Sequence, residues 1–110
     1  MLIFDVETDG LLEELTTGHC INIYDTETHK HERYDPENAP FHEGVKRLRE
    51  ADVIVGHNII GYDIPALKKL YPGWEPMGKV IDTLILARLV FPDIKQKDYG
   101  SYQKGLLPAH

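Results

Sequence analysis

The fold is decided by the stretch Leu2-Ile3-Phe4-Asp5-Val6-Glu7-Thr8-Asp9-Gly10, an apolar run that carries two carboxylates one residue apart. Alternating polar and apolar residues predict a strand, and side chains two positions apart on a strand share a face. Asp5 and Glu7 therefore project together, and we expect the remaining residues of the strand to be buried. A solvated strand face is the alternative interpretation of this motif.

Two anions held this close are unfavourable, because each raises the pKa of the other and both resist leaving water. A divalent cation removes that conflict. Hard oxygen ligands at the spacing of Asp5 and Glu7 suit Mg²⁺ or Mn²⁺. A carboxylate shared between two metal ions is also a common start for sites that cleave phosphodiesters.

Composition limits the class of protein. One domain is expected for 110 residues of which 42% are hydrophobic. The net charge of −6 argues against a free-standing nucleic-acid binder that depends on counterion release. An enzyme whose carboxylates hold metal ions is a different case, because the ions offset local negative charge.

The single cysteine and the absence of long apolar runs bear on the compartment. Cys20 excludes an internal disulfide framework, and its place in a predicted strand indicates a buried thiol. The sequence shows no leader peptide and no apolar stretch of the roughly 20 residues that a membrane span needs. We therefore expect a cytoplasmic protein with no membrane partner.

Beyond the first strand, the hydrophobic pattern changes from period two to helical spacing. Alternation and turn residues predict two further strands joined by a hairpin, and a continuous apolar run predicts a strand buried on both faces and hence parallel. The predicted strands after the first are His19–Asp25, Lys30–Tyr34, Asp52–Gly56 and Lys79–Ile81. The predicted helices are Phe41–Glu50, Tyr62–Tyr71 and a third that follows Asp82-Thr83 and reaches about Val90, with a loop over His57–Gly61.

This order predicts an α/β fold with a mixed sheet, in which antiparallel strands come first and parallel strands alternating with helices follow. That arrangement is of the ribonuclease H-like kind. We expect residues 1–91 to form an incomplete core of this fold. Polar residues predominate in 92–110, which predicts a mobile C-terminal segment.

A second group of polar residues follows the buried strand, in Gly56-His57-Asn58-Ile59-Ile60-Gly61-Tyr62-Asp63. Open α/β sheets place their sites at the C-terminal ends of parallel strands. Each residue also has a structural interpretation: Asp63 as a helix cap, Asn58 as a turn residue and His57 as a loop histidine with ordinary partners. Together with Asp5 and Glu7, they predict a polar cluster at one sheet edge.

The motifs Asp5-Val6-Glu7-Thr8, His57-Asn58 to Tyr62-Asp63, and Ile81-Asp82-Thr83-Leu84 resemble, in order and spacing, one known family. It is the proofreading 3′–5′ exonuclease domain of family A DNA polymerases, and the similarity is closest to the phage type. The resemblance covers nearly the whole chain. It implies a two-metal exonuclease that acts on single-stranded DNA 3′ ends, in the host cell cytoplasm if the chain comes from a phage.

The resemblance also implies roles for matching residues. Asp5 would bridge both metal ions, Glu7 would bind the ion that activates water, and Asp63 would hold the second ion. Four further positions match residues that contact or position the substrate strand: Thr8 and Leu11 at the terminal nucleotide, Asn58 near the scissile phosphate, and Tyr62 beneath the site. We interpret Asp82-Thr83 as the end of a strand and the cap of the next helix.

The third exonuclease motif of the family, a Tyr or His followed four residues later by Asp, is missing here. Tyr99 is followed by Gln103, and Tyr102 by Leu106. We therefore expect an N-terminal fragment of a longer polymerase, whose remainder would be a partner. The isolated chain is expected to be weakly active or inactive.

Two other functions remain open at this stage. The same fold could serve a stand-alone exonuclease that degrades RNA or oligonucleotides. Alternatively, an acidic fragment without one ligand motif could persist as a non-catalytic interaction module of a split polymerase.

Overall fold

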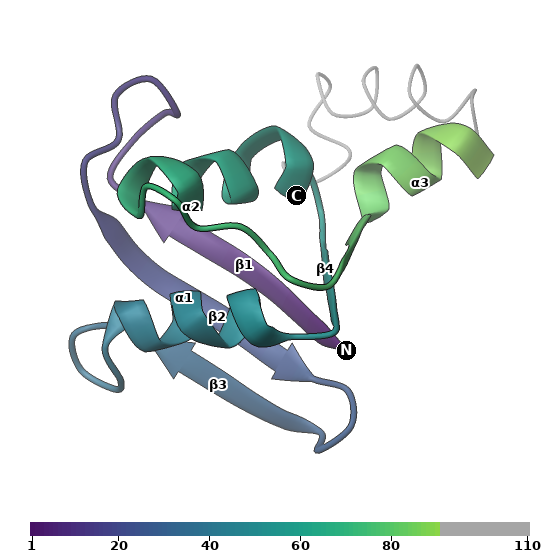
Figure 1. The fold of residues 1–110 in the computed structure, drawn as a ribbon, viewed down its shortest axis with the longest axis horizontal. Coiled ribbons are helices and arrows are strands. Elements are labelled where there is room, and N and C mark those ends of the chain that lie inside the picture. Colours follow the sequence, from purple (N-terminus) through teal and green to yellow (C-terminus); the bar gives the residue numbers. More distant parts are fainter. Residues whose placement is uncertain (91–110) are drawn as a thin grey trace, which may run out of the picture.

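Five strands form one mixed sheet in the computed structural model, which describes residues 1–90 (Figure 1). The order across the sheet is β3-β2-β1-β4-β5. The central strand β1 (Leu2–Thr8) pairs antiparallel with β2 (Gly18–Asp25) and parallel with β4 (Val53–Gly56). Strand β3 (Lys30–Tyr34) pairs antiparallel with β2, and β5 (Lys79–Asp82) pairs parallel with β4. The predicted change from antiparallel to parallel pairing is confirmed.

Helices α1 (Phe41–Glu50) and α2 (Ile64–Leu70) lie over the same face of this sheet (Figure 1). The bounds of α1 agree with the prediction, because Val45 and Leu48 recur at helical spacing and are both buried. Helix α3 (Thr83–Val90) follows β5, and none of its residues is buried against the rest of the described chain. The core between the sheet and the helices includes Leu2, Phe4, Val6, Ile21, Ile23, Ile54, Ile64, Leu67 and Trp74.

The opposite face of the sheet is more exposed than the sequence predicts. Along β1, buried residues alternate with exposed ones, and Ile3 is 43% exposed on the face that also carries Asp5 and Glu7. The expectation that all other residues of this strand are buried is therefore wrong for Ile3. Burial of β4 on both faces is also wrong: Val53 and Val55 are only partly buried, because α1 and α2 both cover the other face.

The predicted boundary between loop and helix at residue 62 is wrong. The helical path begins earlier, with the single π-helical turn η1 (Ile59–Asp63), which leads directly into α2. The Ile64 N–H reaches back to the Ile59 carbonyl, one residue further than in an α-helix. Pro65 lies in the first turn of α2, where a missing N–H costs least.

Several smaller predictions concern single residues or segments. Cys20 is buried and has a free thiol, as expected. No helix in residues 1–90 is long and apolar enough to cross a membrane. The predicted polar segment 92–110, which contains Tyr99 and Tyr102, lies outside the described residues.

Candidate functional site

The carboxylate of Asp63 bonds directly to the strand that carries the other two predicted acids. Its Oδ2 accepts a hydrogen bond of 2.9 Å from the backbone N–H of Val6. Strands β1 and β4 pair only at Leu2 and Ile3, so the N–H of Val6 lies beyond that ladder. Asp63 thus satisfies a buried backbone donor 57 residues away, between Asp5 and Glu7 in the sequence.

Three negative charges on Asp5, Glu7 and Asp63 would be electrostatically unfavourable. Burial, helped by the charge of Asp5, raises the pKa of Asp63 from 3.8 to about 7, against the hydrogen bond from Val6. Asp5 lies on the exposed face of β1, and its partial loss of solvation, together with the neighbouring Glu7, raises its pKa. Both acids would therefore gain from a nearby positive charge.

The oxygen donors of Asp5, Glu7 and Asp63 are of the type that Mg²⁺ and Mn²⁺ prefer, and the raised pKa values of Asp5 and Asp63 fit a site completed by a cation. However, residues 1–90 contain no group of three His, Cys, Asp or Glu side chains close enough together to hold a metal ion. The chemistry of these donors fits a divalent cation, but the side chains of residues 1–90 do not form a complete set of metal ligands.

Asp63 stands at the N-cap position of α2, as its structural interpretation predicted, but its side chain makes no cap hydrogen bond there and accepts from Val6 instead. Asn58 is a turn residue, as one interpretation suggested: its φ is 59° and its ψ is 30°, in the left-handed region. Its amide oxygen lies over Gly61, where an added Cβ would come within 2.4 Å of it. A side chain at position 61 would therefore displace the amide of Asn58.

Asp82 determines the position of this turn. Its carboxylate accepts backbone hydrogen bonds of 2.9 Å each from Asn58, Ile60 and Leu84. The bond from Leu84 confirms that Asp82 caps α3, and the other two tie β5 to the start of η1. This second role is not predicted by the sequence motifs, although the position of Asp82 at the end of a strand adjacent to β4 is a signal for it.

Two of the predicted substrate-binding residues meet each other. The hydroxyls of Thr8 and Tyr62 form a short hydrogen bond with each other, and both oxygens lie within hydrogen-bonding distance of the Gly10 carbonyl, at 2.9 Å and 2.8 Å. These contacts attach the connection after β1 to η1. Leu11, the next residue, has a side chain that is 66% exposed.

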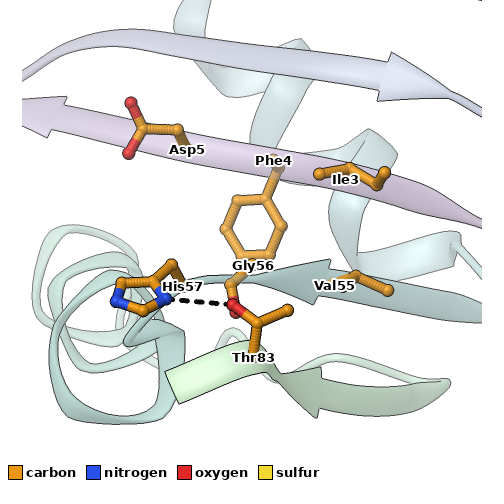
Figure 2. A pocket seen from close by; sticks show the side chains of 7 residues that line it. All are labelled: Ile3, Phe4, Asp5, Val55, Gly56, His57 and Thr83. Atoms are coloured by element: carbon orange, nitrogen blue, oxygen red, sulfur yellow. Dashed lines mark hydrogen bonds between the residues drawn. The ribbon is translucent and has the colours of Figure 1, made fainter. Parts of the chain in front are cut away.

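An open hollow of about 450 Å³ lies beside Asp5, on the sheet face opposite α1 and α2 (Figure 2). Figure 2 shows Asp5 and His57 at one end of the hollow, and Ile3 and Val55 at the other. The Nδ1 of His57 lies 3.1 Å from the hydroxyl of Thr83. His57 thus has an ordinary partner, as its structural interpretation predicted.

Comparisons with known proteins agree with this architecture. A family model described as RNase H superfamily matches residues 2–99. The chain is 34% identical over 117 aligned positions to proteins named DNA-directed DNA polymerase from Escherichia phage T7 and Enterobacteria phage T3. The alignment covers 99% of this chain but only 17% of each phage protein, so the chain spans about a sixth of the length of these relatives.

A similar solved structure is the family B DNA polymerase from the hyperthermophilic archaeon Pyrobaculum calidifontis. It matches 76% of this chain and 15% of its own chain, with a TM-score of 0.56 and 17% sequence identity. At that identity the match bears on the fold alone, and it supports the ribonuclease H-like sheet. The predicted similarity to phage-type polymerases is confirmed by the two phage relatives, and the chain belongs to the RNase H superfamily.

Proposed function

We propose that the chain is a metal-dependent 3′–5′ exonuclease domain that proofreads for a DNA polymerase. Its reaction would be hydrolysis of single-stranded or mispaired DNA at the 3′ end. The observation that carries the proposal is the hydrogen bond from Val6 to Asp63, which attaches a buried acid to the strand segment between Asp5 and Glu7. The similarity to two phage DNA polymerases supports the choice of substrate class.

The three acids would share the metal ions. In this proposal Asp5 would be a ligand of both cations, Mg²⁺ or Mn²⁺, and Glu7 and Asp63 would each be a ligand of one of them. When bound, such cations supply an activated water and offset the charge on the leaving 3′-oxygen. Asp63 is the acid most in need of a counter-charge, since its burial raises its pKa to about 7.

The terminal nucleotide would be held by the connection after β1. Leu11 offers an exposed apolar side chain, against which a base can stack without regard to its identity. Thr8 and Tyr62 fix the backbone on which Leu11 is mounted, and Asn58 would position the strand near the scissile phosphate. A mispaired end unstacks more readily than a paired one, so it would reach this site more often.

A larger polymerase polypeptide would supply most of the DNA affinity. The net charge of −6 disfavours strong independent binding to a polyanion. The phage relatives are several times longer than this chain, which covers 17% of their length. We infer that a polymerase partner delivers the 3′ end.

The test uses excess protein, Mn²⁺ and a 5′-labelled single-stranded oligodeoxynucleotide. We expect slow stepwise shortening from the 3′ end that stops with chelator and is abolished by Asp5→Ala, whose exposed side chain should leave folding nearly unchanged. The exposed acid Glu50 provides a matched control as Glu50→Ala. Equal shortening by wild type and Asp5→Ala would overturn the proposal, and faster shortening of RNA of the same sequence would change the substrate to RNA.

One observation favours a second candidate, a folded interaction module without turnover. Residues 1–90 provide no group of three side chains close enough to bind a metal ion. Titration calorimetry with Mn²⁺ separates the two candidates. A non-catalytic module should give no heat of binding, whereas the exonuclease should give heat that Asp5→Ala removes.

A further inference from the structure

The connection between β1 and β2, residues 9–17, is closed at its base by one acid. The carboxylate of Asp9 accepts hydrogen bonds from the N–H and hydroxyl of Thr16, at 2.9 Å and 2.6 Å, and from the N–H of Thr17 at 3.0 Å. The Asp9 N–H in turn donates to the carbonyl of Thr17. Leu15 is 1% exposed, so the connection is also fastened to the interior.

The tip of this connection is a single helical turn. The N–H groups of Glu14 and Leu15 both donate to the Leu11 carbonyl, at 2.9 Å and 2.8 Å. In a turn this short, the carbonyls of Leu12 and Glu13 have no following helical N–H to accept from. They would be left to solvent unless a side chain reached them.

Lys69 on α2 supplies that side chain. Its ammonium group donates to the carbonyls of Leu12 and Glu13, at 2.9 Å each, across 57 and 56 residues of sequence. A lysine near the end of a helical turn is well suited to this, because its positive charge also interacts favourably with the terminal carbonyls. Fixing a flexible lysine costs side-chain entropy, which two charge-assisted hydrogen bonds offset.

From this geometry we propose that Lys69 is a positioning residue for the substrate: it fixes the turn at 11–15 so that Leu11 is presented in one place to the terminal nucleotide. This inference rests on the proposed exonuclease function. A single exposed leucine needs no explanation by itself. What distinguishes Leu11 is that polar contacts from Tyr62 on η1 and Lys69 on α2 hold the backbone on both sides of it.

The neighbouring lysine provides a matched control. Lys68 is also exposed on α2, but its ammonium pairs with Glu75 at 3.4 Å rather than with the connection. Lys68→Met and Lys69→Met remove the same charge and keep a similar aliphatic stem. Any effect of lost attraction to DNA phosphates is therefore shared by the two variants, and only the effect on the turn differs.

The first measurement needs no DNA. We expect amide hydrogen exchange of Glu14 and Leu15 to be about tenfold faster in Lys69→Met, because their hydrogen bonds depend on the fixed turn. Lys68→Met should leave these amides unchanged, and Lys69→Arg should restore their protection. Exchange that is the same in all variants would overturn the inference.

The second measurement connects the turn to the substrate. Binding of a 5′-fluorescent oligodeoxynucleotide with a non-hydrolysable 3′-terminal linkage is followed in Mn²⁺. Lys69→Met should weaken binding about fivefold more than Lys68→Met does, as expected when a contact residue must be ordered on binding. In a Leu11→Ala background this difference should disappear, because Lys69 acts through Leu11.

The two measurements separate the possible failures. A difference between the lysine variants that persists in the Leu11→Ala background would overturn the role through Leu11. A wild-type chain that does not bind the oligodeoxynucleotide at any protein concentration would overturn the substrate role of Lys69 in this chain, and the shortening assay would then decide the proposed function separately. The exchange of Glu14 and Leu15 would still decide whether Lys69 fixes the turn.

Discussion

Asp63 and Asp82 are equally buried, at 5% exposure each, yet their pKa values move in opposite directions. Burial alone would raise the pKa of Asp82, but backbone hydrogen bonds from Ile60, Leu84 and Asn58 together lower it. Burial, with a smaller contribution from the negative charge of Asp5, raises the pKa of Asp63 to about 7, because the single N–H of Val6 does not offset them. Asp82 is stabilised by the protein itself, whereas Asp63 still lacks a compensating positive charge.

This difference separates a structural carboxylate from one suited to a ligand. A buried carboxylate that accepts several backbone hydrogen bonds behaves like an internal cap. One that lies beside another acid has an unfavourable energy that a bound cation can relieve. Asp82 determines the shape of the turn at Asn58, and Asp63 supplies unmet charge beside Asp5.

The largest expected effect comes from removing the structural acid. Asp82→Ala leaves three backbone N–H groups without their acceptor, so we expect the free energy of unfolding to fall by about 3 kcal/mol. Urea denaturation at pH 7 measures this loss. Asp52→Ala is the control, because its exposed carboxylate accepts one hydrogen bond, from Val53. Equal losses in the two variants would contradict the role assigned to Asp82.

Asp63→Asn should raise the free energy of unfolding, which is the opposite of the effect of Asp82→Ala. The folded pKa of Asp63, about 7, lies above its ordinary value of 3.8, so ionisation destabilises the folded chain increasingly as the pH rises between these two values. Asparagine carries no charge and can still accept from Val6. We expect the variant to be more stable than wild type by on the order of 2 kcal/mol at pH 8 and equally stable at pH 4.

Urea denaturation of both proteins at the two pH values checks this prediction. The difference between variant and wild type isolates Asp63, since acids with lowered pKa values, such as Asp25 and Asp35, contribute equally to both. A variant that is less stable than wild type at pH 8 would mean that the charged form of Asp63 is well accommodated. In that case the comparison with Asp82 would fail.

A bound metal ion should also offset the unfavourable negative charge of Asp63. Mn²⁺ at ten times its dissociation constant is expected to raise the free energy of unfolding at pH 8 by about 1.4 kcal/mol. Thermal denaturation with and without Mn²⁺ measures this gain, which Asp5→Ala should abolish and Glu50→Ala should retain. Stabilisation that persists in Asp5→Ala would show that the cation binds elsewhere.

The sequence predicts the sheet better than it predicts the turn that completes the site. Alternation in Leu2–Thr8 and the helical spacing of Val45 and Leu48 are local signals, and the structure confirms the strand and helix that they predict. The start of η1 depends on Asp82, which lies 22 residues after Ile60 in the chain. No local pattern around residues 57–63 contains that contact, so a loop was predicted where a π-helical turn forms.

The exposure of the sheet face opposite α1 and α2 could not be predicted for a similar reason. Ile3, Val53 and Val55 are apolar, and apolar residues on adjacent strands predict burial on both faces. Which face a helix covers is decided by how its connections run, and α1 and α2 both lie on the other side. Lys69 was likewise indistinguishable from the neighbouring Lys68, because only the fold brings the carbonyls of the connection to one of them.

The smallest expected effect comes from the residue next to Asp63. Tyr62→Phe removes one hydroxyl, which donates to the Gly10 carbonyl and contacts Thr8, and keeps the ring. We expect a loss of about 1 kcal/mol in the free energy of unfolding, the usual contribution of a partly buried hydrogen bond. Denaturation at pH 4 and pH 8 should show the same loss at both values.

The advantage of Asp63→Asn at pH 8 should then be unchanged in the Tyr62→Phe background, because the unfavourable charge of Asp63 arises from its burial and from Asp5. If that advantage shrinks instead, the connection after β1 takes part in burying Asp63, and the contrast with Asp82 depends on the loop as well as on the count of backbone donors.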